Sequence, residues 1–187
     1  MTKFKAMPDR SHVAAPLLET ERLYLRQFRP DDLSASHTLW NEPAVSRFMA
    51  SGKPQSVEDI WKGILQSIGH WQVLGFGYWA IETKATGRFI GNIGFAEFKR
   101  DMVPDMNDTP EAGWALMTAY HGKGFGCEAL AAATAWGDAN LPHAKTACII
   151  APDNIVSMRL AQKFGYREVA STNYKSDPTL LFHRDKP

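Results

Sequence analysis

The feature of this sequence that most constrains its fold is a set of three glycines within five residues, at positions 122, 124 and 126. Glycine has no Cβ, so this backbone is free to take positive φ angles and to approach a ligand closely. Residues 111–116 before the glycines predict a strand, and residues 129–139 after them predict an alanine-rich helix. The first N–H groups of such a helix have no intrahelical partner, and the helix dipole makes this end positive. The sequence therefore predicts a phosphate site between a strand and a helix.

Two common phosphate motifs match this loop poorly. A Walker loop requires Gly-Lys followed by Ser or Thr, but Lys123 is followed by Gly124. A dinucleotide fingerprint, Gly-x-Gly-x-x-Ala at 124–129, would open a βαβ unit and place an acidic residue about 20 positions later. Position 145 is instead a lysine, and the supposed first turn has 123 residues before it. A nucleotide-dependent oxidoreductase stays open as an alternative.

Composition limits the classes of protein to which the chain can belong. Its 187 residues, 44% of them hydrophobic, suit one domain with a substantial core. The 21 basic and 20 acidic residues give a net charge of +1, which predicts neither a nucleic-acid partner nor a membrane partner. The two cysteines lack the spacing of metal ligands and are too few for a disulfide framework, so we expect no metal site and a cytoplasmic location.

The pattern along the chain predicts alternating strands and helices in a single domain at 17–187, after a loose tail at 1–16. Ser56 is expected to cap a helix whose core stripe comprises Val57, Ile60, Trp61, Ile64, Leu65 and Ile68. The charged segment 99–110 is long enough to overhang a site. The remaining predicted elements are a strand at 22–26, a helix from 30 to about 40, strands at 76–82 and 88–98, a strand at 146–150, a helix from 152–154 to Gly165, and a hairpin of 166–170 with 179–183.

The glycine loop resembles the pyrophosphate-binding signature of the GNAT acyltransferases, Arg/Gln-x-x-Gly-x-Gly/Ala. It reads His121-Gly-Lys-Gly-Phe-Gly126 here, so histidine stands where the family has Arg or Gln. Asn154-x-x-Ser157 and Lys163-Phe-Gly-Tyr166 resemble two further family motifs. The stretch Thr20-Glu-Arg-Leu-Tyr-Leu-Arg26 resembles the opening strand of the RimJ/RimL-like branch, which acetylates ribosomal-protein N-termini. The resemblance extends over residues 18–183.

This resemblance implies an α/β (α+β) GNAT fold, with a mixed, largely antiparallel sheet that splays at its middle strands and carries helices on both faces. It also implies an acetyl-CoA-dependent N-acetyltransferase in which a primary amine, from a protein N-terminus or a small molecule, attacks the thioester directly in a ternary complex. The residues that would contact acetyl-CoA are Leu116, Met117, His121, Gly122, Lys123, Gly124, Phe125, Gly126, Cys127 and Asn154.

Acyl transfer also requires a neutral amine, a donor to the developing oxyanion and a proton for the leaving thiolate. A lysine-type amine, with a pKa of about 10.4, is rarely neutral at pH 7, whereas an α-amine near 7.7–8.0 needs only a modest base. By resemblance Glu111 is that base, acting through water, and a backbone N–H at the end of the 114–117 strand meets the oxyanion. The alternative for Glu111 is an ordinary exposed carboxylate at a strand end.

The thiolate's proton donor differs from that of many relatives. Many relatives use a tyrosine in the helix after Asn-x-x-Ser, but the matching position here is Ala161. Ser157 is the predicted substitute, and its alternative role, like that of Asn154, is to cap the helix. The missing tyrosine leaves a non-catalytic acyl-CoA sensor as an alternative. The sequence does not identify the amine, and it fits a monomer or a homodimer.

Overall fold

The computed structural model describes residues 14–48, 54–106 and 108–187. Its sheet has eight strands in the order β1-β2-β3-β4-β5-β6-β8-β7, and every neighbouring pair except β5 and β6 is antiparallel. The strands are β1 (Leu18–Glu19), β2 (Leu23–Arg26), β3 (Tyr78–Thr83), β4 (Phe89–Ala96), β5 (Glu111–Leu116), β6 (Lys145–Ile150), β7 (Arg167–Tyr174) and β8 (Asp177–Asp185). The helices are α1 (Leu33–Asn41), α2 (Pro43–Ser46), α3 (Val57–Leu74), α4 (Phe125–Asn140) and α5 (Ile155–Lys163), with 3-10 turns η1 (Pro30–Asp32) and η2 (Thr118–Tyr120).

The middle of the sheet is splayed. Strands β5 and β6 are in register only at Glu111 and Ala147, where the Ala147 N–H donates to the Pro110 carbonyl at 3.0 Å. Beyond this point the two strands separate toward their C-terminal ends. The predicted splayed, largely antiparallel sheet is therefore confirmed.

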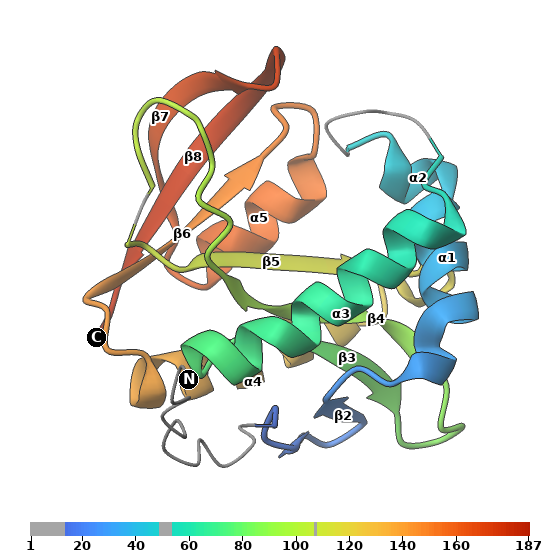
Figure 1. Cartoon of the computed structure of the whole chain (residues 1–187). Coiled ribbons are helices and arrows are strands. Elements are labelled where there is room, and N and C mark those ends of the chain that lie inside the picture. The colour runs from blue at the N-terminus through green and yellow to red at the C-terminus, as the bar shows by residue number, and fades with distance from the viewer. Residues whose placement is uncertain (1–13, 49–53, 107) are drawn as a thin grey trace, which may run out of the picture.

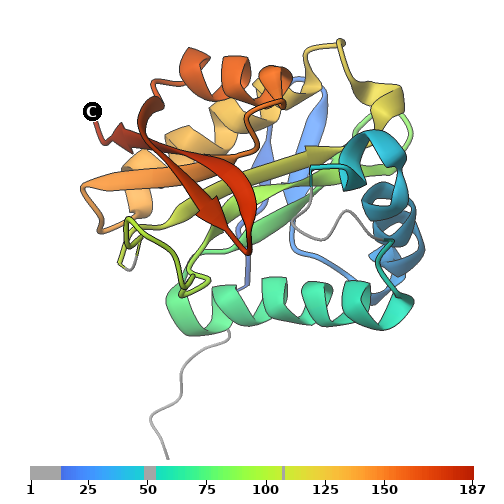
Figure 2. The same cartoon turned by 90° about the horizontal axis from the view of Figure 1, so that it is seen from above.

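Helices cover both faces of the sheet, as predicted. Figure 2 shows α3 along one face and α4 with α5 along the other. The small residues of α4 let it lie close to the sheet, since a Cβ on Gly137 would come within 2.8 Å of the Phe95 ring. Ala129 and Ala133 on the same helix face are fully buried. This close packing holds the N-terminus of α4 in a fixed place beside β5.

Helix α3 begins as predicted, but its apolar stripe is only partly core. The Asp59 N–H donates to the Ser56 hydroxyl at 3.1 Å, which confirms the predicted cap. Ile60 and Ile64 are buried and Ile68 is half-buried. The prediction that Val57, Trp61 and Leu65 are core is wrong, because they are 54%, 36% and 50% exposed. Successive helical residues are about 100° apart, so a face centred on Ile60 and Ile64 leaves Trp61 and Leu65 at its edge.

The segment between β4 and β5 packs against the C-terminal strands (Figure 1). Met102 and Met106 are buried in a cluster with Ala147 of β6 and Leu181 of β8. Figure 1 shows this loop in front of β7 and β8. This packing ties the segment that leads into β5 to strands β6 and β8.

The chain before β1 is described only from residue 14, so residues 1–13 of the predicted tail lie outside the described residues. The Ala15 N–H donates to Gln27 at 2.9 Å, and the Pro16 carbonyl accepts the Trp79 indole N–H at 2.8 Å. Within the described ranges, no helix has the length and apolar character that a membrane crossing requires.

Candidate active site

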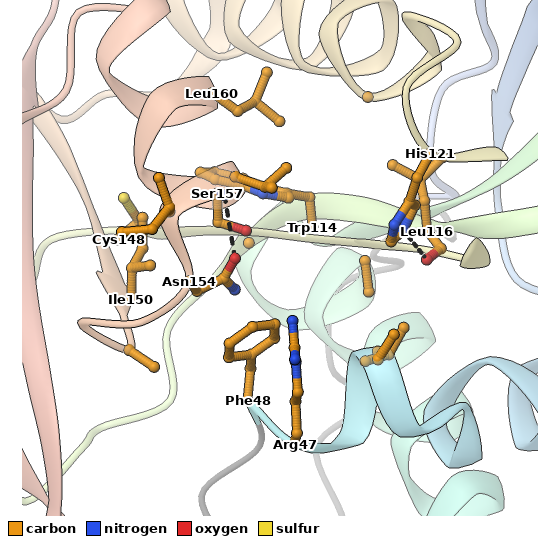
Figure 3. Close-up of a pocket in the computed structure, with 18 of the residues that line it drawn as sticks. Arg47, Phe48, Trp114, Leu116, His121, Cys148, Ile150, Asn154, Ser157 and Leu160 are labelled. Carbon is orange, nitrogen blue, oxygen red and sulfur yellow. Dashed lines mark hydrogen bonds between the residues drawn. The ribbon is translucent and has the colours of Figure 1, made fainter. Parts of the chain in front are cut away.

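A cavity of about 490 Å³ occupies the gap between β5 and β6 (Figure 3). Its walls are the glycine loop with the start of α4, the end of β6 with the start of α5, and the end of α1 with α2. The cavity brings together nine of the predicted site residues: Glu111, Leu116, His121, Gly122, Gly124, Gly126, Cys127, Asn154 and Ser157. Met117, Lys123 and Phe125 lie beside the cavity without lining it.

The glycine loop has the geometry that the sequence predicts for an anion seat. Gly122 and Gly124 have φ angles of 70° and 83°, in the left-handed region that favours glycine. The Glu128 N–H is the first to bond back into the helix, to the Gly124 carbonyl at 3.0 Å. The N–H groups of residues 125–127 precede this bond and are left at the open helix end. A Cβ on Gly122 would meet no atom within 4 Å, so the space that its side chain would take is open to a ligand.

The loop is clamped from behind by Arg22 and Glu128. Arg22 donates through its backbone N–H and Nε to the two Glu128 oxygens, each at 2.7 Å, and through Nη1 to the Lys123 carbonyl at 3.0 Å. Its guanidinium also lies 4.3 Å from the centre of the Phe125 ring. Partial burial works against the charge of Glu128, but hydrogen bonds from Thr20 and Arg22 outweigh it and hold its pKa below the usual value. We did not expect this clamp, although Thr20 and Arg22 belong to a motif that the sequence analysis singled out.

The two basic side chains of the loop bond to nearby carbonyl groups. His121 Nε2 lies 2.8 Å from the Leu116 carbonyl oxygen, with the ring directed at the end of β5 (Figure 3). Lys123 Nζ donates to the Ala119 carbonyl at 2.8 Å and lies 6.0 Å from the Tyr120 ring centre. Because these two side chains already bond to carbonyl groups, the free donors of the loop are its main-chain N–H groups.

The backbone of β5 supplies a second set of donors. The Met117 N–H donates to the Ile90 carbonyl of β4 at 2.9 Å. Backbone groups alternate in direction along a strand, so the N–H groups of Leu116 and Trp114 point the other way, toward β6. The splay removes the strand that would otherwise accept these two hydrogen bonds. They are therefore available to a ligand in the gap.

Asn154 and Ser157 stand across the gap from β5. The Asn154 side-chain oxygen caps α5 by accepting the Ser157 backbone N–H at 3.2 Å. The capping role thus belongs to Asn154, while the Ser157 hydroxyl is directed into the cavity (Figure 3). Ala161, one turn further along α5, is fully buried in the core. Ser157 is therefore the residue of α5 whose hydroxyl lines the cavity.

Glu111 is buried and held by an ion pair, so the alternative of an exposed carboxylate at a strand end is wrong. Arg100 donates to its two oxygens, at 2.5 Å from Nε and 2.7 Å from Nη2. Burial works against the charge of Arg100, but the bonds to Glu111 outweigh it, so the pKa of Arg100 is raised. Arg100 lies in the segment predicted to overhang a site, but its pairing with Glu111 was not predicted. Local sequence patterns could not have predicted the pair, because Arg100 meets Glu111 only through the way the segment between β4 and β5 folds back.

Tyr78 adds a hydroxyl to the same face of β5. A Cβ built on Gly113 would lie 2.0 Å from the Tyr78 hydroxyl oxygen, so this hydroxyl fills the place of a side chain at position 113. Burial, together with the nearby charge of Glu111, raises the pKa of Tyr78 well above its usual value. The hydroxyl therefore stays protonated at neutral pH. Sequence reasoning missed this residue because Tyr78 reaches β5 across β4, at Gly94.

The third wall of the cavity comes from the end of α1 and from α2, and the sequence analysis assigned no element to residues 43–48. Trp40, Val45, Arg47 and Phe48 line the cavity here. The wall is tied to the glycine side by Glu42, whose Oε2 accepts the Thr118 N–H at 2.7 Å. Proline at the first position of α2 was the one available sequence signal.

A metal ion needs a set of ligands from side chains such as His, Cys, Asp and Glu. Among residues 14–48, 54–106 and 108–187, no group of three His, Cys, Asp or Glu side chains is placed to hold a metal ion. Cys148 lines the cavity, but burial raises the pKa of its thiol far above the usual value. It is therefore protonated at neutral pH.

Comparisons with known proteins agree with this architecture. A family model described as an acetyltransferase (GNAT) domain matches residues 22–167. The chain is similar to the uncharacterized N-acetyltransferase YoaA of Bacillus subtilis, with 26% identity over 153 residues that make up 82% of this chain and 84% of the relative. A putative GNAT-family acetyltransferase from Bordetella pertussis superposes with a TM-score of 0.80 at 25% identity, over 91% of this chain and 99% of that one.

The chain therefore belongs to the GNAT acetyltransferase family and is an acyltransferase. Enzymes of this family use acetyl-CoA. The structure of RimL, a ribosomal L7/L12 α-N-protein acetyltransferase, in complex with coenzyme A superposes with a TM-score of 0.74 at 16% identity, over 91% of this chain and 98% of that one. That identity supports a shared fold alone, so the RimJ/RimL-like branch stays a prediction.

Proposed function

We propose that this chain transfers the acetyl group of acetyl-CoA to a primary amine by direct attack in a ternary complex. The observation that carries the proposal is the continuity of the cavity. One space joins the glycine loop, the open N–H groups of β5 and the wall made by α1 and α2. A carrier seated on the loop and an amine beside α2 would therefore meet in the β5–β6 gap.

The glycine loop fits the diphosphate of acetyl-CoA. The main-chain N–H groups of residues 122–127 supply donors, and the two left-handed glycines leave the approach free of side chains. Leu116 and Asn154 stand on either side of the gap, where they would contact the pantetheine arm. Positioning two reactants in this way lowers the activation barrier of a bimolecular reaction by about 7–11 kcal/mol.

Each remaining chemical requirement has a candidate group. Acetyl-CoA supplies the acetyl group as a thioester. The N–H of Leu116 or Trp114 donates to the carbonyl oxygen as it gains negative charge. Glu111 accepts the amine's proton through water, with Arg100 holding its orientation, and the Ser157 hydroxyl donates to the leaving sulfur.

The proposal is tested by the rate of thiol release from acetyl-CoA in the presence and absence of a panel of amines. Release that rises with amine concentration and saturates, together with an acetylated product, supports the transferase. Tight binding of acetyl-CoA with no amine-dependent release would instead support the non-catalytic sensor. A panel of protein N-terminal peptides beside small amines tests the RimJ/RimL-like branch in the same assay.

A further inference from the structure

The cavity extends past the β5–β6 gap to the wall formed by Trp40, Val45, Arg47 and Phe48. This wall lies on the side of the sheet where Trp40 and Val45 pack in the same cluster as Ala115. Arg47 and Phe48 point from the end of α2 toward Trp114, Asn154 and Ser157 (Figure 3). A carrier held by the glycine loop would leave this end for the amine, so the inference that follows rests on the proposed function.

Some charged side chains that line the cavity have an ion-pair partner and others have none. The charged side chains among the described lining residues, apart from His121, are Arg47, Glu111 and Asp153. Glu111 already has an ion-pair partner in Arg100, through two hydrogen bonds. No ion pair joins Arg47 or Asp153 to another group within the described ranges. The acceptor end therefore offers one free positive and one free negative side chain.

Arg47 is preorganised to bind a planar anion. Its guanidinium carbon lies 4.4 Å from the centre of the Phe48 ring, a cation–π contact that holds the side chain in place and leaves its N–H groups without an ion-pair partner among the described residues. Trp40, Val45 and Phe48 add apolar surface to the same wall. A guanidinium with a free edge matches the two oxygens of a carboxylate.

We propose that the acceptor is a small zwitterionic amine, meaning an amine that also carries a carboxylate, and that Arg47 binds the carboxylate. Asp153 lies in the loop after β6, on the wall formed by the end of β6 and the start of α5, and attracts the ammonium form of the arriving amine. Opposite charges on two different walls orient the acceptor in the gap. The amine, once neutral, then faces the acetyl group while its carboxylate stays at Arg47.

Two other acceptor classes match this end less well. A diamine or polyamine would place a second positive charge near Arg47, and like charges repel. A protein N-terminus has an amide where a free amino acid has its carboxylate, so Arg47 would gain no ion pair from it. The free guanidinium thus favours a free acid over its amide.

The test compares matched acid and amide acceptors, such as phenylalanine with phenylalaninamide and alanine with alaninamide. Thiol release is measured at saturating acetyl-CoA, and the ratio of kcat/KM for acid over amide is determined for the wild-type protein and for Arg47→Gln. Intrinsic differences between the two amines cancel when this ratio is compared between proteins. We expect the ratio to fall by about 10- to 100-fold in Arg47→Gln, with the Kd of acetyl-CoA unchanged.

Arg47→Lys should retain part of the preference, because it keeps the charge and loses the fork of donors. Arg167→Gln is the matched control, because Arg167 is exposed on β7 and lies outside the cavity lining. The acid-over-amide ratio of kcat/KM in this variant should equal the wild-type value.

Three results would overturn the inference. An unchanged ratio in Arg47→Gln, or a wild-type preference for putrescine over every acid, would remove it and leave acetyl transfer intact. A weaker Kd for acetyl-CoA in Arg47→Gln would place Arg47 with the carrier instead of the acceptor. Failure of every amine to accelerate thiol release in the wild-type protein would overturn the proposed function together with the inference.

Discussion

The two ends of the cavity are built in different ways. The glycine-loop end is made of main-chain N–H groups, held in place by Arg22 and Glu128 behind them. The α2 end is made of side chains, among them Arg47, which is exposed and has no ion-pair partner among the described residues. A seat made of backbone fits one constant chemical group, whereas a wall made of side chains can change its specificity by substitution. This difference predicts a fixed carrier and a variable acceptor.

The largest expected effect tests the backbone end. Gly124→Asp places a Cβ at a φ of 83° and 3.3 Å from Arg22 Nη2, so it strains the loop and disturbs the clamp that holds it, and acetyl-CoA affinity should fall by at least about 100-fold. Titration with acetyl-CoA measures the Kd, and Gly126→Asp should behave similarly. Gly87→Asp is the control, because Gly87 has a φ of 65° in a turn outside the cavity lining. Equal affinity in folded Gly124→Asp would contradict the backbone seat.

This backbone end was also the part that the sequence predicted best. Glycine spacing, the strand before it and the helix after it are local patterns, and each of them appears in the structure. The buried pair of Arg100 and Glu111, and the Tyr78 hydroxyl at Gly113, depend on long-range register that local patterns do not contain. The exposed Trp61 of α3 was mistaken for core for the same reason, since a helical stripe does not reveal which of its edges meets the sheet.

The next effect concerns the chemistry between the two ends. Glu111→Gln should lower kcat by about 100-fold while leaving the Kd of acetyl-CoA unchanged, because the carboxylate is lost and the carrier's contacts are not. Steady-state kinetics measure kcat, titration with acetyl-CoA measures the Kd, and thermal unfolding measures the stability lost with the ion pair to Arg100. Glu82→Gln is the matched control, since Glu82 pairs with Arg26 at 2.6 Å outside the cavity lining. It should lose stability with an unchanged kcat. A wild-type kcat in Glu111→Gln would remove Glu111 from proton transfer.

A smaller effect is expected at Ser157. Ser157→Ala keeps the α5 cap, because that bond uses the Ser157 backbone N–H, so only the hydroxyl is lost. We expect kcat to fall by about 10-fold, less than the roughly 100-fold or more usual for a lost proton donor because a thiolate leaves readily without one, with little change in the free energy of unfolding. Ser67→Ala on α3, whose hydroxyl donates to the Gly63 carbonyl at 2.9 Å, controls for loss of a serine elsewhere. Unchanged turnover would leave Ser157 without a chemical role.

The smallest effect concerns the clamp behind the glycine loop. Glu128→Gln should cost about 1–2 kcal/mol of unfolding free energy at pH 7 and weaken acetyl-CoA binding a few-fold. The folded-state pKa of Glu128 is lowered, so its contribution is complete above the unfolded value of about 4.3 and is lost as the pH falls through the folded value. Denaturant unfolding should therefore show the wild-type advantage shrinking in acid.

Glu58→Gln is the control for that measurement. Glu58 pairs with Lys62 on the surface of α3, with both side chains more than half exposed, so its loss should change stability very little. If Glu128→Gln were no more harmful than Glu58→Gln, the clamp would have no part in holding the loop.

The backbone seat for the diphosphate is tested most simply by a crystal structure of the protein with bound acetyl-CoA. We expect diphosphate oxygens within about 2.7–3.2 Å of main-chain nitrogens in residues 122–127, and the thioester between β5 and β6. A diphosphate bound elsewhere on the molecule, or loop nitrogens that bond to protein atoms in its place, would show that the glycine loop is not the seat.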